Sequence, residues 1–263
     1  MIKKIYSFII KKNKVDYFLH KIVKIYFQLL PTTMMQNRIS RNFIPDSIVY
    51  GKEYPYYKTL FRKFTKYNFN NKGDISRYFS LIINIEHLFE NEDVDGDLAE
   101  VGVWKGNTAS ILAFYAKKYD RKCYLFDTFE GFDNKDLVSS DKKFEKGHFS
   151  DTSIKIVQNV IGVDNVDCCE FIKGYFPDSI PDKILEKKFS VVSLDADLYM
   201  PTKSGLEWFY PRMTNKSIFL LHDYSSKAWD GCKKAIDEFC KKENLNLVLM
   251  PDKSGSAFIK INK

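Results

Sequence analysis

The stretch that decides the fold is Asp97-Leu98-Ala99-Glu100-Val101-Gly102-Val103-Trp104-Lys105-Gly106-Asn107-Thr108. Residues 98–103 are apolar apart from Glu100, which is typical of a buried parallel strand. Gly102 and Gly106 then allow a tight turn into a helix that we expect over residues 107–118. Because glycines at such a junction are typical of cofactor-binding α/β folds, the stretch predicts a doubly wound sheet with a ligand site at this turn.

Strands and helices alternate from this stretch onward. We expect strands at 98–103, 122–126, 166–172, 189–194 and 217–222, and helices at 75–90, 107–118, 152–160, 201–213 and 229–243. Apolar strands between amphipathic helices favour a parallel sheet with right-handed crossovers.

The C-terminal end has a different pattern. Strands at 246–250 and 257–261 flank Pro251-Asp252-Lys253-Ser254-Gly255, a combination that predicts a hairpin. A mostly parallel, seven-stranded, Rossmann-like sheet with an antiparallel C-terminal hairpin is typical of class I S-adenosylmethionine methyltransferases. Most dinucleotide dehydrogenases lack the hairpin.

The N-terminal part forms an extension over residues 1–74, ahead of a domain over 75–263. Residues 1–30 carry seven lysines and one aspartate, and therefore most of the net charge of +7. They predict either a basic amphipathic helix at the inner face of an anionic membrane or a helix packed on the body or a partner subunit. The aromatic-rich residues 31–74 form either a lid over a substrate or ordinary packing against the domain. We also expect the protein to form a homo-oligomer.

Composition excludes several classes of protein. Outside residues 1–30 the charge is close to neutral, so we expect no nucleic-acid partner. Five cysteines without a C-x-x-C pair indicate reduced thiols, no structural zinc and a cytoplasmic protein. No apolar run approaches the ~18 residues of a membrane span, and because a clean apolar h-region and a cleavage site are missing we expect no secretory signal.

The first candidate site is the glycine turn. Gly102-x-x-x-Gly106 does not match the Gly-x-Gly-x-x-Gly spacing that seats a pyrophosphate. Glu100 would repel a pyrophosphate but suits the ammonium of a methionine moiety, and Asp127, at the end of the next strand, can accept hydrogen bonds from both ribose hydroxyls. These acids favour S-adenosylmethionine over NAD. The alternative is that the glycines serve only strand–helix packing.

The second candidate site combines the ends of two later strands. Asp195 and Asp197 follow one apolar strand, and His222 and Asp223 follow the next. Carboxylates suit Mg²⁺, whereas a histidine is more typical of Mn²⁺, Fe²⁺ or Zn²⁺. One carboxylate can hold a divalent cation while the other removes a proton. The alternatives are that the aspartates cap a helix before Pro201 and that His222 forms hydrogen bonds without ligating a metal.

Taken together, these motifs make the chain resemble the macrocin O-methyltransferase family, bacterial class I methyltransferases that act on sugar hydroxyls of macrolides and related glycosides. The resemblance covers about residues 75–245, and residues 1–45 have no counterpart. It is carried, in order, by residues 96–106, 126–132, 149–153, 173–178, 194–199, 222–224 and 231–239.

The resemblance implies a role for individual residues. The cofactor would be bound by Glu100, Gly102, Trp104, Gly106, Thr108, Asp127, Thr128, Phe129, Lys173 and Gly174. The metal site would consist of Asp195, His222 and Asp223. The catalytic set would consist of Asp195, His222 and Asp197, with Asp197 as the general base. The family often has an aspartate where this chain has His222, so the resemblance implies Mg²⁺ without fixing the metal.

The expected function is methyl transfer from S-adenosylmethionine to a hydroxyl of a sugar or glycoside, either a cell-surface polysaccharide or a natural-product sugar. Two alternatives stay open at this point. One is a metal-dependent methyltransferase of a phenol or catechol. The other is a non-catalytic partner protein held at a membrane by residues 1–30.

Overall fold

The computed structural model describes residues 56–68, 71 and 73–262 of the chain. The expectations for residues 1–30, and for the part of the extension before residue 56, lie outside these residues. The described residues form one seven-stranded sheet in the order β3-β2-β1-β4-β5-β7-β6. The strands are β1 Asp97–Val101, β2 Cys123–Asp127, β3 Cys169–Lys173, β4 Phe189–Leu194, β5 Met213–Leu221, β6 Val248–Leu249 and β7 Ala257–Ile261.

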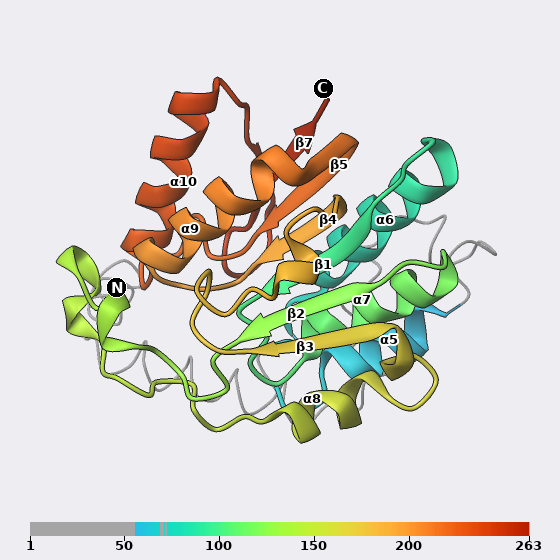
Figure 1. Ribbon diagram of the computed structural model, residues 1–263, viewed down its shortest axis with the longest axis horizontal. Coiled ribbons are helices and arrows are strands. Elements are labelled where there is room, and N and C mark those ends of the chain that lie inside the picture. Colours follow the sequence, from blue (N-terminus) through green and yellow to red (C-terminus); the bar gives the residue numbers. More distant parts are fainter. Residues whose placement is uncertain (1–55, 69–70, 72, 263) are drawn as a thin grey trace, which may run out of the picture.

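The predicted sheet is confirmed. Strands β1 to β5 pair in parallel, whereas β7 pairs antiparallel with β5 and β6 antiparallel with β7. The chain thus has the mostly parallel sheet with an antiparallel C-terminal part that is typical of class I methyltransferases (Figure 1).

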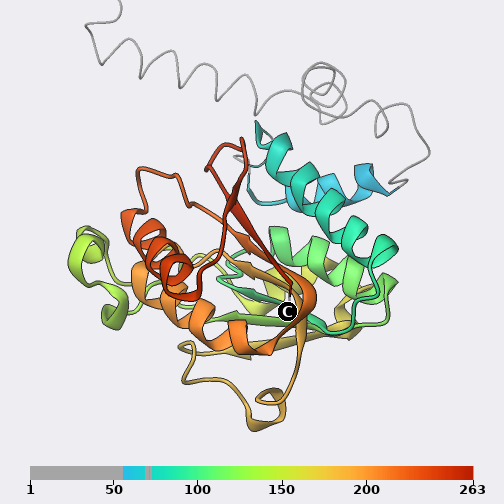
Figure 2. The same ribbon diagram turned by 90° about the horizontal axis from the view of Figure 1, so that it is seen from above.

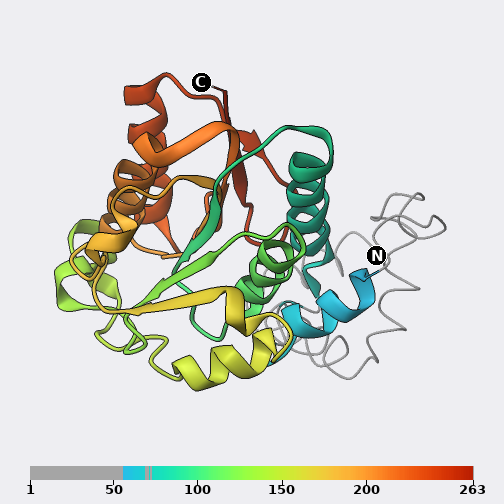
Figure 3. The ribbon, with the colours of Figure 1, turned by 45° about the vertical axis from the view of Figure 1, so that its right-hand side comes forward.

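Helices cover both faces of the sheet (Figure 2). One face packs against α5 Tyr57–Phe64, α6 Ile75–Asn91, α7 Asn107–Lys118 and α8 Ile154–Ile161. The other face packs against α9 Tyr199–Phe209 and α10 Asp230–Glu243. Short 3-10 helices lie at Asn134–Asp136, Ser139–Lys143, Val166–Cys168, Asp182–Ile184 and Tyr210–Arg212. Figure 3 shows these helices on either side of the sheet. The buried apolar side chains form two hydrophobic cores, one on each face.

Strand register brings the predicted functional residues to one edge of the sheet. Val101 of β1 pairs with Phe126 of β2 and with Leu194 of β4, and Leu194 pairs with Leu221 of β5. The residue that follows each of these is therefore at the same level of the sheet. Those residues are Gly102, Asp127, Asp195 and His222.

Several element boundaries differ from the sequence prediction. Residues 166–168 form a 3-10 turn before β3, and only Val248 and Leu249 of the expected strand 246–250 pair with β7. Helix α9 begins at Tyr199 rather than at residue 201, because a proline is tolerated in the first turn of a helix. Strand β5 begins at Met213, where the expected helix 201–213 was to end.

The described part of the N-terminal extension packs against the domain. Leu60, Phe61 and Phe64 of α5 are buried in the same core as α6 and α7. Asn107, at the start of α7, donates a 3.1 Å hydrogen bond to the carbonyl of Lys63. Helix α5 thus packs on the domain, whereas Asn68 and Asn71 line a cavity, so the choice between lid and packing for residues 31–74 and the domain boundary at residue 74 stay predictions.

The described residues contain neither a disulfide bond nor a membrane-spanning helix. All five cysteines lie among them, and all five are free thiols. Within residues 56–68, 71 and 73–262, no helix combines the length and the apolar character needed to cross a membrane.

Candidate active site

The turn between β1 and α7 requires glycine for two different reasons. Gly102 has φ +85°, and a Cβ at this position would lie 2.1 Å from the carbonyl oxygen of Asp195. Gly106 has φ +80°, and its Cβ would lie 2.7 Å from Cγ1 of Val157 in α8. Gly106 therefore serves helix packing and lines no described cavity, whereas Gly102 lets the ends of β1 and β4 approach each other beside the site.

Asp127 holds the backbone of the glycine turn. Its Oδ2 accepts hydrogen bonds from the N–H groups of Val103 and Trp104, both at 2.8 Å, and its Oδ1 accepts one from Phe129 at 2.6 Å. Burial raises the pKa of Asp127, and the three N–H donors oppose that rise. A carboxylate has about four acceptor sites, so Asp127 can bind a ligand hydroxyl while it keeps these bonds.

Two cavities meet at this turn. The first encloses about 630 Å³ and is mostly apolar, and the second encloses about 1180 Å³ and is more polar. The residues that line both are Gly102, Trp104, Phe149, Asp195 and Asp197. A ligand that passes from the first cavity to the second must therefore cross the ends of β1 and β4.

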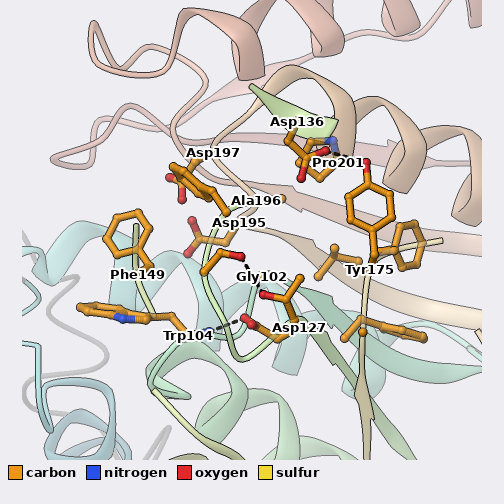
Figure 4. A pocket seen from close by; sticks show the side chains of 17 residues that line it. Gly102, Trp104, Asp127, Asp136, Phe149, Tyr175, Asp195, Ala196, Asp197 and Pro201 are labelled. Carbon is orange, nitrogen blue, oxygen red and sulfur yellow. Dashed lines mark hydrogen bonds between the residues drawn. The ribbon is translucent and has the colours of Figure 1, made fainter. Parts of the chain in front are cut away.

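The apolar cavity extends over the ends of β2 and β3. At one end, away from Trp104 and Phe149, the hydroxyl of Tyr175 donates a 2.7 Å hydrogen bond to Asp136 (Figure 4). Burial raises the pKa of Asp136 to about 6, and the Tyr175 hydroxyl opposes the rise. Thr128 also lines this cavity.

Three further residues of the predicted cofactor set are Phe129, Lys173 and Gly174. Gly174 lines the apolar cavity, but neither Lys173 nor Phe129 does. The Lys173 ammonium is half-exposed and lies 2.8 Å from Oε1 of Glu130, and the Phe129 ring is buried in the core. Of these three, the structure therefore places only Gly174 at the cavity.

Glu100 is an unusual residue for the interior. It is 1% exposed, and its Oε1 accepts a long hydrogen bond of 3.5 Å from the Ser193 hydroxyl. Its Oε2 has no hydrogen-bond partner among the described residues, and the side chain lines the polar cavity. Burial, with a further contribution from Asp195, raises the pKa of Glu100 well above its usual range. A buried carboxylate without a partner is costly, so this position suits a cationic ligand.

Arg77 of α6 is a site residue that the sequence analysis missed. Its Nη2 donates hydrogen bonds to Oδ2 of Asp195 at 2.7 Å and to the Thr108 hydroxyl at 2.9 Å. Burial acts to raise the pKa of Asp195, but His222 and Arg77 outweigh it and hold the pKa well below its usual value. The sequence did contain a signal for this residue. Arg77 lies four residues before Leu81, so it is on the apolar face of the helix, where a charged side chain is unexpected.

The predicted metal ligands lie close together. Nδ1 of His222 is 2.7 Å from Oδ1 of Asp195 and 2.7 Å from Oδ2 of Asp223. Neither oxygen lies in the direction that an N–H hydrogen bond requires. One ligand atom of each residue lies within 4.8 Å of the others, and the two distances from His222 are near the ~3 Å that separates neighbouring ligands of an octahedral cation.

The charge of His222 follows from this arrangement. Burial and Arg77 lower its pKa, but Asp195 and Asp223 outweigh them and raise it to about 10. Without a metal the imidazole is therefore protonated near neutral pH, and a metal ion that binds Nδ1 would displace a proton.

Asp197 lies beside this triad without belonging to it. Its backbone has φ +60°, and its side chain lines both cavities. Burial raises its pKa well above the usual range, and the Asp195 and Asp223 carboxylates raise it further. A carboxylate with a raised pKa is suited to accept a proton near neutral pH.

The helix-capping interpretation of Asp195 and Asp197 is wrong. The residue that caps α9 is Asp141, whose Oδ2 accepts a 2.7 Å hydrogen bond from the N–H of Tyr199. The Asp141 side chain also contacts Gly231 in the first turn of α10, where a Cβ would lie 2.3 Å from Oδ2. Asp141 thus attaches the polar segment 130–151 to two helices.

Aromatic side chains from that segment form a wall of the site. The Phe149 ring lies 5.3 Å from Trp104 and 6.1 Å from Trp229, measured between centroids. Trp104 also donates a 2.8 Å hydrogen bond from Nε1 to Asp151. Trp104 and Phe149 line both cavities, and Trp229 lines the polar one. The periodicity of the sequence did not indicate that Phe149 and Trp229 belong to the site.

Comparisons with known proteins agree with this geometry. Residues 77–259 match the model of the macrocin O-methyltransferase (TylF) family. The mycinamicin III 3''-O-methyltransferase of Micromonospora griseorubida is 26% identical over 178 residues, which cover 62% of this chain and 68% of that protein. The demethyldecarbamoylnovobiocin O-methyltransferase of Streptomyces niveus is 26% identical over 168 residues, which cover 60% of this chain and 63% of that protein.

Solved structures share the fold. The O-methyltransferase NovP superposes with a TM-score of 0.65 at 20% identity, over 80% of this chain and 99% of that one. The calicheamicin methyltransferase CalS11 superposes with a TM-score of 0.58 at 22% identity, over 84% of this chain and 95% of that one.

Proposed function

The chain belongs to the macrocin O-methyltransferase family and is an O-methyltransferase, and from this premise we propose that it transfers a methyl group from S-adenosylmethionine to a hydroxyl of a sugar or glycoside. The observation that carries the proposal is the meeting of the two cavities at Gly102, Asp195 and Asp197. A cofactor in the apolar cavity would present its methyl group at this junction, and an acceptor in the polar cavity would reach it there.

The described residues fit each part of the cofactor. The apolar cavity suits the adenosine, with Asp127 at its edge to bind the ribose hydroxyls. The unpartnered Oε2 of Glu100 suits the methionine ammonium. The first turn of α7, with Thr108 beside the guanidinium of Arg77, offers N–H groups and positive charge to the methionine carboxylate.

The triad fits a divalent cation. Asp195, His222 and Asp223 would hold it, with Mg²⁺ or Mn²⁺ as the candidates given two carboxylates and one imidazole. A bound cation would orient an acceptor hydroxyl and lower its pKa. The positive charges of His222 and Arg77 keep Asp195 ionised against the effect of burial.

The chemical step follows from the position of Asp197. The acceptor oxygen forms a bond to the methyl carbon as the carbon–sulfur bond breaks, so that S-adenosylhomocysteine leaves. Asp197 accepts the hydroxyl proton, a role worth about 10²–10⁴-fold in rate. Alignment of oxygen, carbon and sulfur by the two cavities supplies much of the remaining acceleration.

The polar cavity favours a sugar as the acceptor. It combines the aromatic rings of Phe149 and Trp229 with the polar side chains of Asn71, Lys253 and Ser254. A pyranose has apolar C–H faces and a rim of hydroxyls, and it matches such a lining better than a flat phenol does. Both a cell-surface polysaccharide and a natural-product sugar meet this description.

The acceptor class is tested by methyl transfer from labelled S-adenosylmethionine to matched panels of glycosides and catechols, with Mg²⁺, with Mn²⁺ and with a chelator. We expect metal-dependent transfer to glycosides. Transfer to catechols alone would replace the sugar assignment, and equal transfer in the chelator would remove the metal.

Residues 1–30 stay a candidate contact with an anionic membrane because of their seven lysines. Co-sedimentation of the full chain with phosphatidylglycerol vesicles, compared with phosphatidylcholine vesicles, tests this contact. Light scattering of the same preparation tests the expected homo-oligomer.

A further inference from the structure

A small third cavity lies beside His222, and Arg77 and His222 line both this cavity and the polar one. The small cavity is bounded by residues of α6, β5 and the β6–β7 hairpin, and His222, Asp252, Ser256 and Arg77 contribute its polar groups. Its size is that of a site for one ordered water. No step of the proposed methyl transfer uses Asp252 or Ser256.

Four buried polar atoms of this cavity's lining residues lack a hydrogen-bond partner within residues 56–68, 71 and 73–262. One is Nδ1 of His222, which faces the two aspartates of the triad, and the other three are Nε2 of His222, Oδ2 of Asp252 and Oγ of Ser256. Ser256 is only 5% exposed. Buried polar atoms are almost always paired, so three unpaired atoms beside one small cavity indicate that a polar molecule joins them.

The chemistry of the three groups identifies that molecule. An imidazole N–H, a carboxylate oxygen and a hydroxyl are complementary to water, which can accept from the first and donate to the others. Nδ1 of His222 faces Asp195 and Asp223, so Nε2 is the ring nitrogen left for this contact. A histidine that binds a metal usually donates its other N–H to a carboxylate or a water.

We propose that one ordered water in this cavity joins Nε2 of His222 to Asp252 and Ser256, and that Asp252 is a positioning residue for the His222 imidazole. This inference rests on the proposed metal site for its functional consequence. It gives the C-terminal hairpin, which carries none of the predicted catalytic groups, a role in setting the orientation and tautomer of one metal ligand.

The hairpin is well placed for this role because its tip is fixed from three sides. Oδ1 of Asp252 accepts a 2.8 Å hydrogen bond from the N–H of Ser256. The N–H of Lys253 donates to Asp74 at the start of α6 at 3.1 Å, and the N–H of Ser225 donates to the carbonyl of Gly255 at 2.9 Å. Oδ2 of Asp252 is therefore held at the cavity.

The test is the variant Asp252→Asn in the full chain. An asparagine keeps an oxygen for the N–H of Ser256 but replaces the other oxygen with an N–H₂ group, which cannot accept a hydrogen bond from the water. We expect the affinity for Mn²⁺, measured by electron paramagnetic resonance titration, to fall about 10–100-fold. We also expect the side-chain ¹⁵N resonances of His222, assigned by their loss in His222→Asn, to shift in the metal-free protein.

Asp93→Asn is the matched control, because Asp93 is exposed and far along the chain from the hairpin, and the substitution removes the same charge. It should change neither readout. Ser256→Ala keeps the backbone N–H and removes only the hydroxyl, so it should act in the same direction as Asp252→Asn and more weakly. It also provides a test if Asp252→Asn fails to fold.

The outcomes separate this inference from the proposed function. Unchanged ¹⁵N resonances in Asp252→Asn and Ser256→Ala, with unchanged Mn²⁺ affinity, would overturn the water-mediated contact. If the unmodified protein binds no Mn²⁺, the proposed metal site fails, and the ¹⁵N comparison in the metal-free proteins still decides the contact between His222 and the hairpin.

Discussion

Arg77 donates a 2.7 Å hydrogen bond from Nη2 to Oδ2 of Asp195, across 118 positions of sequence. The same nitrogen contacts Thr108 at the start of α7. One guanidinium therefore lies between the first turn of α7, where the cofactor's methionine end would bind in the proposed site, and the carboxylate that would hold the metal. Because both Arg77 and Asp195 are largely buried, this pair is more sensitive to substitution than an ion pair at the surface.

The variant Arg77→Met keeps much of the side-chain length and removes the charge. It leaves Asp195 without one of its two cationic neighbours, so we expect a loss of stability of about 3–5 kcal/mol. Denaturant unfolding measures the effect. Lys117→Met, which breaks the solvent-exposed pair with Asp167, should cost at most about 1 kcal/mol. Equal losses in both variants would contradict the importance of the buried pair.

Asp197→Asn tests the proposed base. The amide is nearly the same size but cannot accept the hydroxyl proton, so kcat should fall about 10²–10⁴-fold. Binding of S-adenosylhomocysteine, measured by calorimetry, should stay within a few-fold of the unmodified protein, because Asp197 is placed beside the acceptor. Turnover at the normal rate would remove Asp197 from the mechanism.

Gly102→Ala tests the close approach of β1 and β4. The new methyl group would lie 2.1 Å from the carbonyl oxygen of Asp195, at a residue with φ +85°. We expect a loss of stability of at least about 2 kcal/mol together with loss of cofactor binding. Gly73→Ala is the control, since nothing lies within 4 Å of its added Cβ. A Gly102→Ala protein with unchanged melting temperature would show that the turn can open without cost.

Asp136 predicts a pH-dependent contribution to stability. Burial raises its pKa in the folded protein to about 6, above the value of about 3.9 in an unfolded chain. The folded state therefore holds more protons than the unfolded state between about pH 4 and pH 6, and stability falls as the pH rises through this range. Above pH 6 the loss is complete.

Asp136→Asn removes this titration while its oxygen can still accept the hydroxyl of Tyr175. The variant should gain stability relative to the unmodified protein between pH 4 and pH 7, by on the order of 1 kcal/mol. Melting temperatures at both pH values measure the difference. A constant offset between the two proteins across this range would contradict the raised pKa.

The sequence allowed the fold and much of the candidate site to be predicted because both depend on local patterns. Asp127, at the end of one buried strand, and Asp195 and His222, each directly after another, lie at one sheet edge because these parallel strands pair in register. The hairpin was recognisable from the turn residues between two strands. The prediction assigned too many residues to the strand 246–250, since periodicity does not show where pairing stops.

Other features depend on contacts between distant segments. Arg77 reaches Asp195, Asp141 caps a helix that begins at Tyr199, and Asp252 lies beside His222 only after the hairpin folds back onto α6. None of these contacts leaves a pattern in the local sequence, so the sequence did not indicate which residues contact each other. The predicted roles of Lys173 and Phe129 came from the resemblance, and neither residue lines either of the two large cavities.

The most direct test of the methyltransferase assignment is calorimetric titration of the full chain with S-adenosylhomocysteine, with and without Mg²⁺. Glu100→Gln keeps the shape of the side chain and removes the charge that suits the methionine ammonium, whereas Glu90→Gln changes an exposed residue of α6 as a control. We predict micromolar binding that weakens about 10–100-fold in Glu100→Gln and is unchanged in Glu90→Gln. An absence of binding in the unmodified protein, or equal binding in all three, would contradict the proposed cofactor site.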